Sequence, residues 1–151
     1  MPLRRVEASI LVQAPSEDVF RWVADYRNAS KALDGVRQWR PLDPARTTGR
    51  GARFKVRIAV FGITAGTTLE IDRWEEPRVI GWHADRGPVA VRGEWVFAGH
   101  PSGTDVRLTI AYDPPGGILG ALGTRELGGL ARRRLQAGLD TMRDAIEATA
   151  D

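Results

Sequence analysis

The chain has 151 residues, no cysteine, two histidines and a formal net charge of +3 at pH 7. Without cysteine it has no disulfides or thiolate metal ligands, and two histidines leave any metal site dependent mainly on carboxylates. We therefore expect no metal and no other cofactor, and a single domain over residues 1–151, which is long enough to bury its own core.

Hydropathy and charge also narrow the expected partners. No long apolar segment occurs and residues 1–5 read MPLRR, so we expect neither a signal peptide nor an integral membrane segment and place the protein in the cytoplasm. The basic run RRR at 132–134 lies in a predicted helix that also carries acids and lacks interleaved exposed aromatics. This pattern is typical of a solvated helix face, so we expect no nucleic-acid partner.

The N-terminal part predicts one strand and two short helices. Apolar residues alternate imperfectly over 3–12, which indicates a first strand that ends at the sequence PSED, residues 15–18. Ser16 is the predicted N-cap of a short helix with acids in its first turn. A second short helix is expected over 27–33, and Gly35 ends it.

Six further strands are predicted from period-two alternation between turn residues. They cover residues 36–41, 53–60, 67–72, 79–84, 89–98 and 104–112. Residues 44–51 form a predicted loop, and turns are expected at Gly62, 74–77, 85–88 and 99–103. The short connections between consecutive strands favour an antiparallel meander.

The last third of the chain, residues 117–151, contains no proline and carries one apolar stripe with helical spacing. The stripe consists of Leu127, Ala131, Leu135, Leu139, Met142 and Ile146. Four glycines in or near this helix allow two interpretations, and they are Gly120, Gly123, Gly128 and Gly129. Either they leave space for a ligand, or the helix starts near Thr124 after an irregular lead-in and its glycine pair permits close helix-to-sheet contact.

These elements together predict an α+β fold. It consists of a seven-stranded antiparallel sheet wrapped around a long C-terminal helix, with two short helices between strands 1 and 2. The apolar face of the long helix needs a partner surface, and the concave face of the sheet supplies it. We expect a cavity between the two, and the apolar, hinge-rich segment 114–119 is a candidate lid beside its mouth.

Five short sequence segments carry a resemblance to a known family. They are ILVQAP at 10–15 with EDVF at 17–20 and VAD at 23–25, GARF at 51–54, WEEPRVI at 74–80, GEWVF at 93–97, and GTDV at 103–106. In this order they resemble the START-like superfamily, also called SRPBCC or helix-grip, and in particular its polyketide cyclase/dehydrase and lipid-transport branch. The resemblance implies a sheet that grips the C-terminal helix around a mainly apolar cavity. It leaves the chemistry open, because members include cyclases, dehydratases, lipid carriers, receptors and co-chaperones.

The predicted ligand-binding residues are those expected to face the space between sheet and helix. They are Val56, Ile58, Leu69, Ile71, Trp82, Val91, Trp95, Leu108, Ile110, Tyr112, Leu127, Ala131 and Leu135. Trp82 and Trp95 either form an aromatic wall for a planar ligand or belong to the core. Trp22, Trp39 and Trp74 are assigned to packing and turns.

Acid–base chemistry has one candidate residue, Tyr112, at the inner end of the last strand. Its hydroxyl either binds a ligand carbonyl and acts as a weak acid, or belongs to an ordinary core tyrosine. Alternation places His83, Arg57 and Glu94 on the outer face, although a one-residue bulge would reverse these directions. His100 is expected in a turn.

Three functions remain open from the sequence. The first is binding or transport of a small hydrophobic or amphipathic ligand, such as a lipid, a polyketide or an aromatic molecule. The alternative is a polyketide cyclase/dehydratase-like enzyme that uses Tyr112, helped by His83 if the register is shifted. A further alternative is a protein-interaction module that uses the outer sheet face or the arginine-bearing helix, and a homodimer is also left open.

Overall fold

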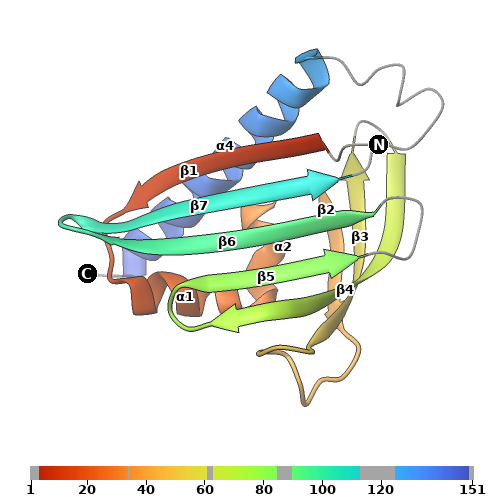
Figure 1. Cartoon of the computed structure of the whole chain (residues 1–151), viewed down its shortest axis with the longest axis horizontal. Helices are drawn as coiled ribbons and strands as arrows, with labels where there is room; N and C mark the ends of the chain where they lie inside the picture. The colour runs from red at the N-terminus through yellow and green to blue at the C-terminus, as the bar shows by residue number, and fades with distance from the viewer. Residues whose placement is uncertain (1–3, 34, 61–62, 85–89, 113–124, 150–151) are drawn as a thin grey trace.

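The computed structural model describes all residues except 1–3, 34, 61–62, 85–89, 113–124 and 150–151 (Figure 1). Its main element is a seven-stranded antiparallel sheet. The strands are β1 (Arg4–Val12), β2 (Val36–Pro41), β3 (Arg53–Val60), β4 (Ile63–Glu75), β5 (Val79–Ala84), β6 (Val91–His100) and β7 (Gly103–Tyr112). The spatial order is β1-β7-β6-β5-β4-β3-β2, so β2 to β7 form the expected meander and β1 joins its far edge beside β7.

The helices are α1 (Ser16–Ala24), the 3₁₀ turn η1 (Tyr26–Asn28), α2 (Ala29–Ala32) and the long α4 (Arg125–Thr149). Figure 1 shows the C-terminal half of α4 behind β1 and β7, α2 behind β6 and β5, and α1 below β6 at the lower left. This arrangement confirms the predicted α+β fold. None of the helices in the described part of the chain is both long and apolar enough to cross a membrane.

The core lies between the concave sheet face and the helices. On α4, Leu139 and Met142 are fully buried and Ile146 is 3% exposed, while Leu135 packs against the core with part of its surface exposed. The predicted apolar stripe is therefore confirmed over the C-terminal half of the helix. On α1, Val19 and Phe20 bury the face that meets the sheet.

Helix α4 crosses α2 at very close range, and Gly138 makes this approach feasible. A Cβ atom at Gly138 would overlap the carbonyl oxygen of Ala32 and lie 3.0 Å from its carbonyl carbon. At Gly129, by contrast, no atom of the described residues lies within 4 Å of such a position, so the described structure gives it no part in the close helix-to-sheet contact considered from the sequence. The helix begins at Arg125, in agreement with the predicted start near Thr124. Gly120, Gly123 and the candidate lid at 114–119 lie outside the described residues.

Most strand bounds follow the prediction, and the main differences are in β4 and β6. β4 ends at Glu75, three residues after the predicted strand, so the turn predicted at 74–77 lies at 76–78 instead. β4 begins at Ile63, four residues before the predicted strand, because Thr64 to Gly66 continue the ladder opposite β3. β6 continues through His100, so the predicted turn at 99–103 shrinks to Pro101 and Ser102, and the placement of His100 in a turn is wrong. Gly103 permits this tight return, since its φ is +149° and a Cβ there would overlap the carbonyl oxygen of Val12.

The prediction that Ser16 caps α1 is wrong. Pro15 occupies the N-cap position, and no side chain caps the helix. The Ser16 hydroxyl instead lies 3.1 Å from Oγ1 of the fully buried Thr104, which donates a hydrogen bond of 2.8 Å to the carbonyl oxygen of Ala14. Because the Thr104 proton is used there, Ser16 is the donor to Thr104.

We therefore expect Ser16→Ala to lower the free energy of unfolding by about 1 kcal/mol through loss of the Thr104 bond. In a Thr104→Val background the same substitution is expected to cost nothing further, and urea denaturation of the four proteins measures this coupling. A Ser16→Ala effect that persists unchanged in Thr104→Val would show that Ser16 acts on the helix end after all.

Candidate functional site

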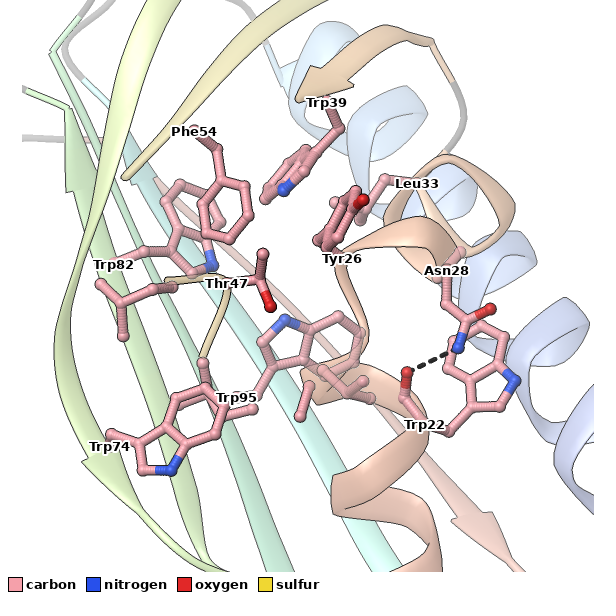
Figure 2. Close-up of a pocket in the computed structure, with 15 residues that line it drawn as sticks. Trp22, Tyr26, Asn28, Leu33, Trp39, Thr47, Phe54, Trp74, Trp82 and Trp95 are labelled. Carbon is pink, nitrogen blue, oxygen red and sulfur yellow. Dashed lines mark hydrogen bonds between the residues drawn. The ribbon is translucent and has the colours of Figure 1, made fainter. Parts of the chain in front are cut away.

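An aromatic cavity lies between the concave face of β2 to β6 and the segment formed by α1, η1 and α2 (Figure 2). The space open to the centre of a water-sized sphere measures about 50 Å³, which is room for about four water molecules. Its aromatic walls are Trp22, Tyr26, Trp39, Phe54, Trp74, Trp82 and Trp95. All five tryptophans of the chain therefore border one small space.

Contacts between aromatic rings hold these walls in place. The Phe54 ring centroid lies 5.9 Å from that of Tyr26 and 6.0 Å from that of Trp39, so one phenyl ring joins β3 to β2 and η1. On the other side, Trp95 stacks on Phe97 with 6.2 Å between centroids and an interplanar angle of 2°. Tilted and stacked ring pairs of this kind add to the stabilisation that the rings gain from burial.

Trp82 takes its position from a glycine on the neighbouring strand. Trp82 in β5 and Gly93 in β6 are directly opposite in the ladder, and a Cβ at Gly93 would overlap the six-membered ring of the Trp82 indole. The indole therefore lies flat over the Gly93 backbone. This contact turns the ring toward the cavity and leaves it 6% exposed.

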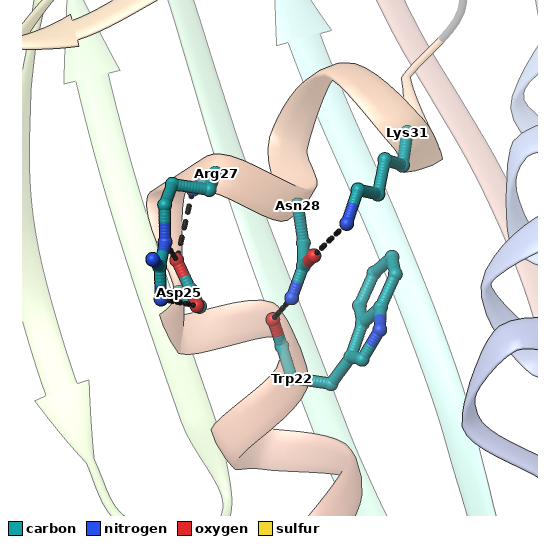
Figure 3. A network of polar contacts seen from close by, with 5 residues as sticks. All are labelled: Trp22, Asp25, Arg27, Asn28 and Lys31. Atoms are coloured by element: carbon teal, nitrogen blue, oxygen red, sulfur yellow. Dashed lines mark hydrogen bonds and ion pairs between the residues drawn. The ribbon is translucent and has the colours of Figure 1, made fainter. Parts of the chain in front are cut away.

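A polar network fixes the turn between α1 and α2 (Figure 3). The Asn28 side-chain amide donates to the Trp22 carbonyl oxygen at 2.7 Å, and Lys31 Nζ donates to Asn28 Oδ1 at 3.0 Å. Asp25 accepts from the Arg27 backbone N–H at 3.0 Å and from its guanidinium at 2.9 and 2.7 Å. These bonds set the backbone that carries Trp22 and Tyr26 into the cavity wall.

The Arg27 side chain lowers the pKa of the Asp25 carboxyl below its ordinary value of 3.8, chiefly through the hydrogen bonds of its guanidinium. Because the pKa is lower in the folded chain than in the unfolded one, the stabilisation is fully present above pH 3.8. It is lost only as the pH falls further, through the lowered pKa. The turn is therefore held by an ionised carboxylate at neutral pH.

A wider groove adjoins the cavity on the side of α4. It has a volume of about 400 Å³ by the same measure and lies between α1 and the C-terminal end of α4. Its lining is mixed, with Asp18, Arg21 and Asp25 on the polar side and Ile146 among the apolar contacts. Trp22 borders both spaces, as does Asn28, so the Trp22 side chain is part of the wall that separates them.

Of the predicted ligand-binding residues, Ile71, Trp82 and Trp95 line this cavity. The other described ones lie elsewhere on the sheet or on α4 and are not among the lining residues of the cavity. Val56, Leu69 and Leu108 are buried in the core; Ile58, Val91, Ile110 and Leu135 pack against it with part of their surface exposed; Ala131 and Tyr112 are half-buried. The side chain of Leu127 lies outside the described residues. The role of these residues in ligand binding stays a prediction.

Tyr112, the predicted catalytic residue, lies at the end of β7 opposite Arg4 and Val91. It is not among the lining residues of the aromatic cavity, whose tyrosine is Tyr26. Its assignment as an acid therefore stays a prediction.

Trp22, Trp39 and Trp74, which the sequence assigned to packing and turns, pack against the core as expected, and all three also line the cavity. A bulge explains Trp74. β4 shifts register between Ile71 and Arg73, so Ile71 pairs with Trp82 while Trp74 pairs with Ile80 on the same inner face. Simple alternation from Ile71 would have turned Trp74 outward.

A register shift also turns Trp39 toward the cavity. β2 shifts register between Val36 and Gln38, after which Trp39 pairs with the fully buried Val56. Tyr26, Phe54 and Thr47 were also not predicted as site residues. Thr47 comes from the loop before β3, a segment without a periodic signal that would show its direction.

The outward directions predicted for His83, Arg57 and Glu94 are confirmed. His83 Nδ1 lies 2.6 Å from Asp72 Oδ2 on the outer face, and its side chain is 28% exposed. Glu94 accepts from Arg73 at 3.2 Å on the same face, and Arg57 is exposed. Within the described part of the chain, no group of three or more carboxylate, imidazole or thiol side chains is placed to hold a metal ion.

Solved structures of similar fold cover the chain almost completely. A Thermus thermophilus protein has a TM-score of 0.82 and 21% identity, with 98% of this chain and 100% of that chain covered. The Zhui aromatase/cyclase of a Streptomyces species has a TM-score of 0.75 and 21% identity, with 99% and 96% covered. A START superfamily protein from Mycobacterium smegmatis has a TM-score of 0.74 and 13% identity, with 96% and 98% covered. At these identities the likeness concerns the fold alone.

The sequence itself gives the assignment. No curated protein sequence matches the chain. Residues 4–147, however, match the family described as polyketide cyclase/dehydrase and lipid transport. With nearly the whole chain matched and the helix-grip architecture observed, this protein belongs to the polyketide cyclase/dehydrase and lipid transport family.

Proposed function

We propose that the protein binds a small hydrophobic molecule with an aromatic ring in the cavity bordered by its tryptophans. The observation that carries the proposal is the convergence of all five tryptophans, with Tyr26 and Phe54, on one space between sheet and helices. Flat aromatic walls suit a planar ligand, because they offer a large contact area at little cost in conformational entropy. Membership of a family that includes lipid transport supports the same class of function.

The size of the cavity restricts the ligand. Its 50 Å³ accommodate about one aromatic ring, since four waters occupy roughly 120 Å³ of liquid, whereas pockets for drug-sized ligands measure about 300–1,000 Å³. A whole lipid or polyketide therefore exceeds the described space. A longer molecule has to extend beyond the cavity, and the adjoining groove of about 400 Å³ shares Trp22 and Asn28 with it.

The enzymatic alternative receives less support from the geometry. Among the described lining residues, the groups that exchange protons with a substrate are the hydroxyls of Tyr26 and Thr47, and neither is joined to a carboxylate or an imidazole. General acid–base catalysis draws its efficiency from a positioned group whose pKa is tuned by such neighbours. We therefore propose binding rather than turnover as the function of this cavity.

Titration with ethylbenzene and acetophenone, followed by tryptophan fluorescence, tests the proposal. We expect a saturable change for at least one of them. Ala24→Leu, which places extra carbon atoms in the cavity lining, is expected to weaken binding at least about tenfold by steric exclusion. The control is Ala137→Leu on the exposed face of α4, which should leave the affinity unchanged.

Two results would contradict the proposal. One is the absence of any saturable response to either compound in the unaltered protein. The other is equal affinity of the Ala24→Leu variant and the unaltered protein, because it would place the bound compound somewhere other than this cavity.

A further inference from the structure

The cavity contains hydrogen-bond donors that lack a protein acceptor. No hydrogen bond joins the indole N–H of Trp39, Trp82 or Trp95 to any residue that the structure describes. Trp82 and Trp95 are only 6% and 5% exposed, yet no buried side-chain nitrogen in the described part of the chain is left without a partner. Their nitrogens therefore open on accessible space, and the cavity is the space that both side chains border.

The picture of the site agrees with this conclusion. Figure 2 shows the ring nitrogens of Trp82 and Trp95 turned toward the space around the Thr47 hydroxyl, with the Trp39 nitrogen facing the same space from β2. The nitrogen of Trp74 is turned away from Thr47. Three indole donors and one hydroxyl thus converge from three strands and a loop.

Acceptors are scarce on the same walls. The Trp22 carbonyl oxygen accepts from Asn28, and the Asn28 side-chain oxygen accepts from Lys31. No carboxylate and no imidazole is among the described lining residues, and neither is a cationic side chain. The described walls of the cavity therefore offer uncharged hydrogen-bond donors and no charged group.

Such a lining discriminates between ligands by their acceptors. A hydrocarbon ring that displaces water from the cavity leaves the indole N–H groups without partners, and each such loss carries a desolvation penalty. An anion would satisfy the donors but would be buried without a countercharge, which is also costly. A neutral ring that carries a carbonyl oxygen meets both conditions.

We infer that the aromatic cavity selects neutral aromatic ligands bearing a carbonyl or similar acceptor oxygen, which Trp82 and Trp95 bind through their indole N–H groups. This inference rests on the proposed function, since it specifies the ligand class of the same cavity. Trp82 and Trp95 are then specificity-determining residues, and Thr47 and Trp39 complete the polar side of the site.

Three probes with one benzene ring separate the possibilities. They are acetophenone, which has a neutral carbonyl, ethylbenzene, which has the same shape without it, and benzoate, which carries a charge. We expect acetophenone to bind at least as tightly as ethylbenzene although it is the less hydrophobic compound, and benzoate to bind most weakly. In ¹H–¹⁵N spectra, the indole N–H signals of Trp82 and Trp95 are expected to move downfield with acetophenone and not with ethylbenzene.

Variants then assign the selectivity to particular donors. Trp82→Phe and Trp95→Phe keep an aromatic ring but remove the N–H, so each is expected to lower the preference for acetophenone over ethylbenzene by about two- to tenfold. Ala137→Leu, on the exposed face of α4 and outside the cavity lining, is the control, and it should leave the preference unchanged.

The outcomes distinguish this inference from the proposed function. Tighter binding of ethylbenzene, with unmoved indole signals and a preference unaffected by the variants, would overturn the inference while ligand binding itself stands. Binding of none of the three probes would overturn both. The spectra of the unaltered protein decide the matter even if a tryptophan variant fails to fold.

Discussion

Gly138→Ala is expected to lower the free energy of unfolding by about 3 kcal/mol, although alanine favours a helix by about 1 kcal/mol over glycine. The added methyl group would occupy the position of the Ala32 carbonyl oxygen. A backbone carbonyl at the end of α2 does not rotate aside as a flexible side chain does, so α4 must move away from α2. That movement separates the buried side chains of Leu139 and Met142 from their neighbours.

Gly129→Ala is the matched control in the same helix. No atom of the described part of the chain lies within 4 Å of its Cβ position, so only the gain in helix propensity applies, and the variant is expected to be more stable by up to about 1 kcal/mol. Urea denaturation followed by circular dichroism measures the free energy of unfolding of both variants. If this free energy changed equally and in the same direction in both, the contact between α2 and α4 would be looser than described.

Gly93→Ala is expected to lower the free energy of unfolding by about 2 kcal/mol and to abolish binding in the aromatic cavity. The new Cβ overlaps three ring carbons of Trp82, so the indole has to leave the backbone of β6. On the concave face, the open space nearest to it is the cavity that it already borders. The displaced ring fills this space and excludes the ligand.

Gly99→Ala provides the comparison on the same strand, because a Cβ there meets nothing within 4 Å and the residue is exposed. It should change stability by less than about 0.5 kcal/mol. Tryptophan fluorescence in urea and the acetophenone titration report the two effects of Gly93→Ala. A variant that keeps the affinity and the emission of the unaltered protein would contradict the argued position of the Trp82 ring.

The strand framework was predictable because its signals are local. Val36–Pro41 and Val79–Ala84 coincide with the predicted bounds, since alternation and turn residues mark a strand without knowledge of its neighbours. The family resemblance was likewise carried by short segments in order, and the match over residues 4–147 confirms it. The helix stripe placed Leu139, Met142 and Ile146 in the core for the same reason.

The site was less predictable because its geometry depends on pairing between strands. The register shifts in β2 and β4 bring Trp39 and Trp74 to the inner face, and a bulge of this kind leaves no clear mark in one sequence. Trp22 lies on α1, and the buried Phe20 packs this helix against the sheet. The centroid of the Phe20 ring lies 5.2 Å from that of Trp74 and 5.6 Å from that of Phe97. Such contacts between distant segments are not encoded in periodicity.

Gly138 and Gly93 show that the sequence alone does not reveal which glycines the fold requires. The sequence draws attention to glycines that cluster, such as Gly128 and Gly129, whereas the positions that tolerate no side chain are isolated ones. Whether a glycine is required is decided by the atom opposite it. For Gly138 that atom belongs to Ala32, which is far away in the sequence, and for Gly93 it belongs to Trp82 on the neighbouring strand.

The pairing of β1 with β7 has a consequence for biosynthesis. Arg4 pairs with Tyr112 and Val12 with Thr104, so the first strand to leave the ribosome finds its hydrogen-bonding partner only after the last strand has been made. Until then β1 has no strand partner, and the meander from β2 to β7 is able to assemble first from neighbouring hairpins. The addition of β1 to the sheet, and with it the contact of α4 with β1, is therefore expected to be a late step of folding on the translated chain.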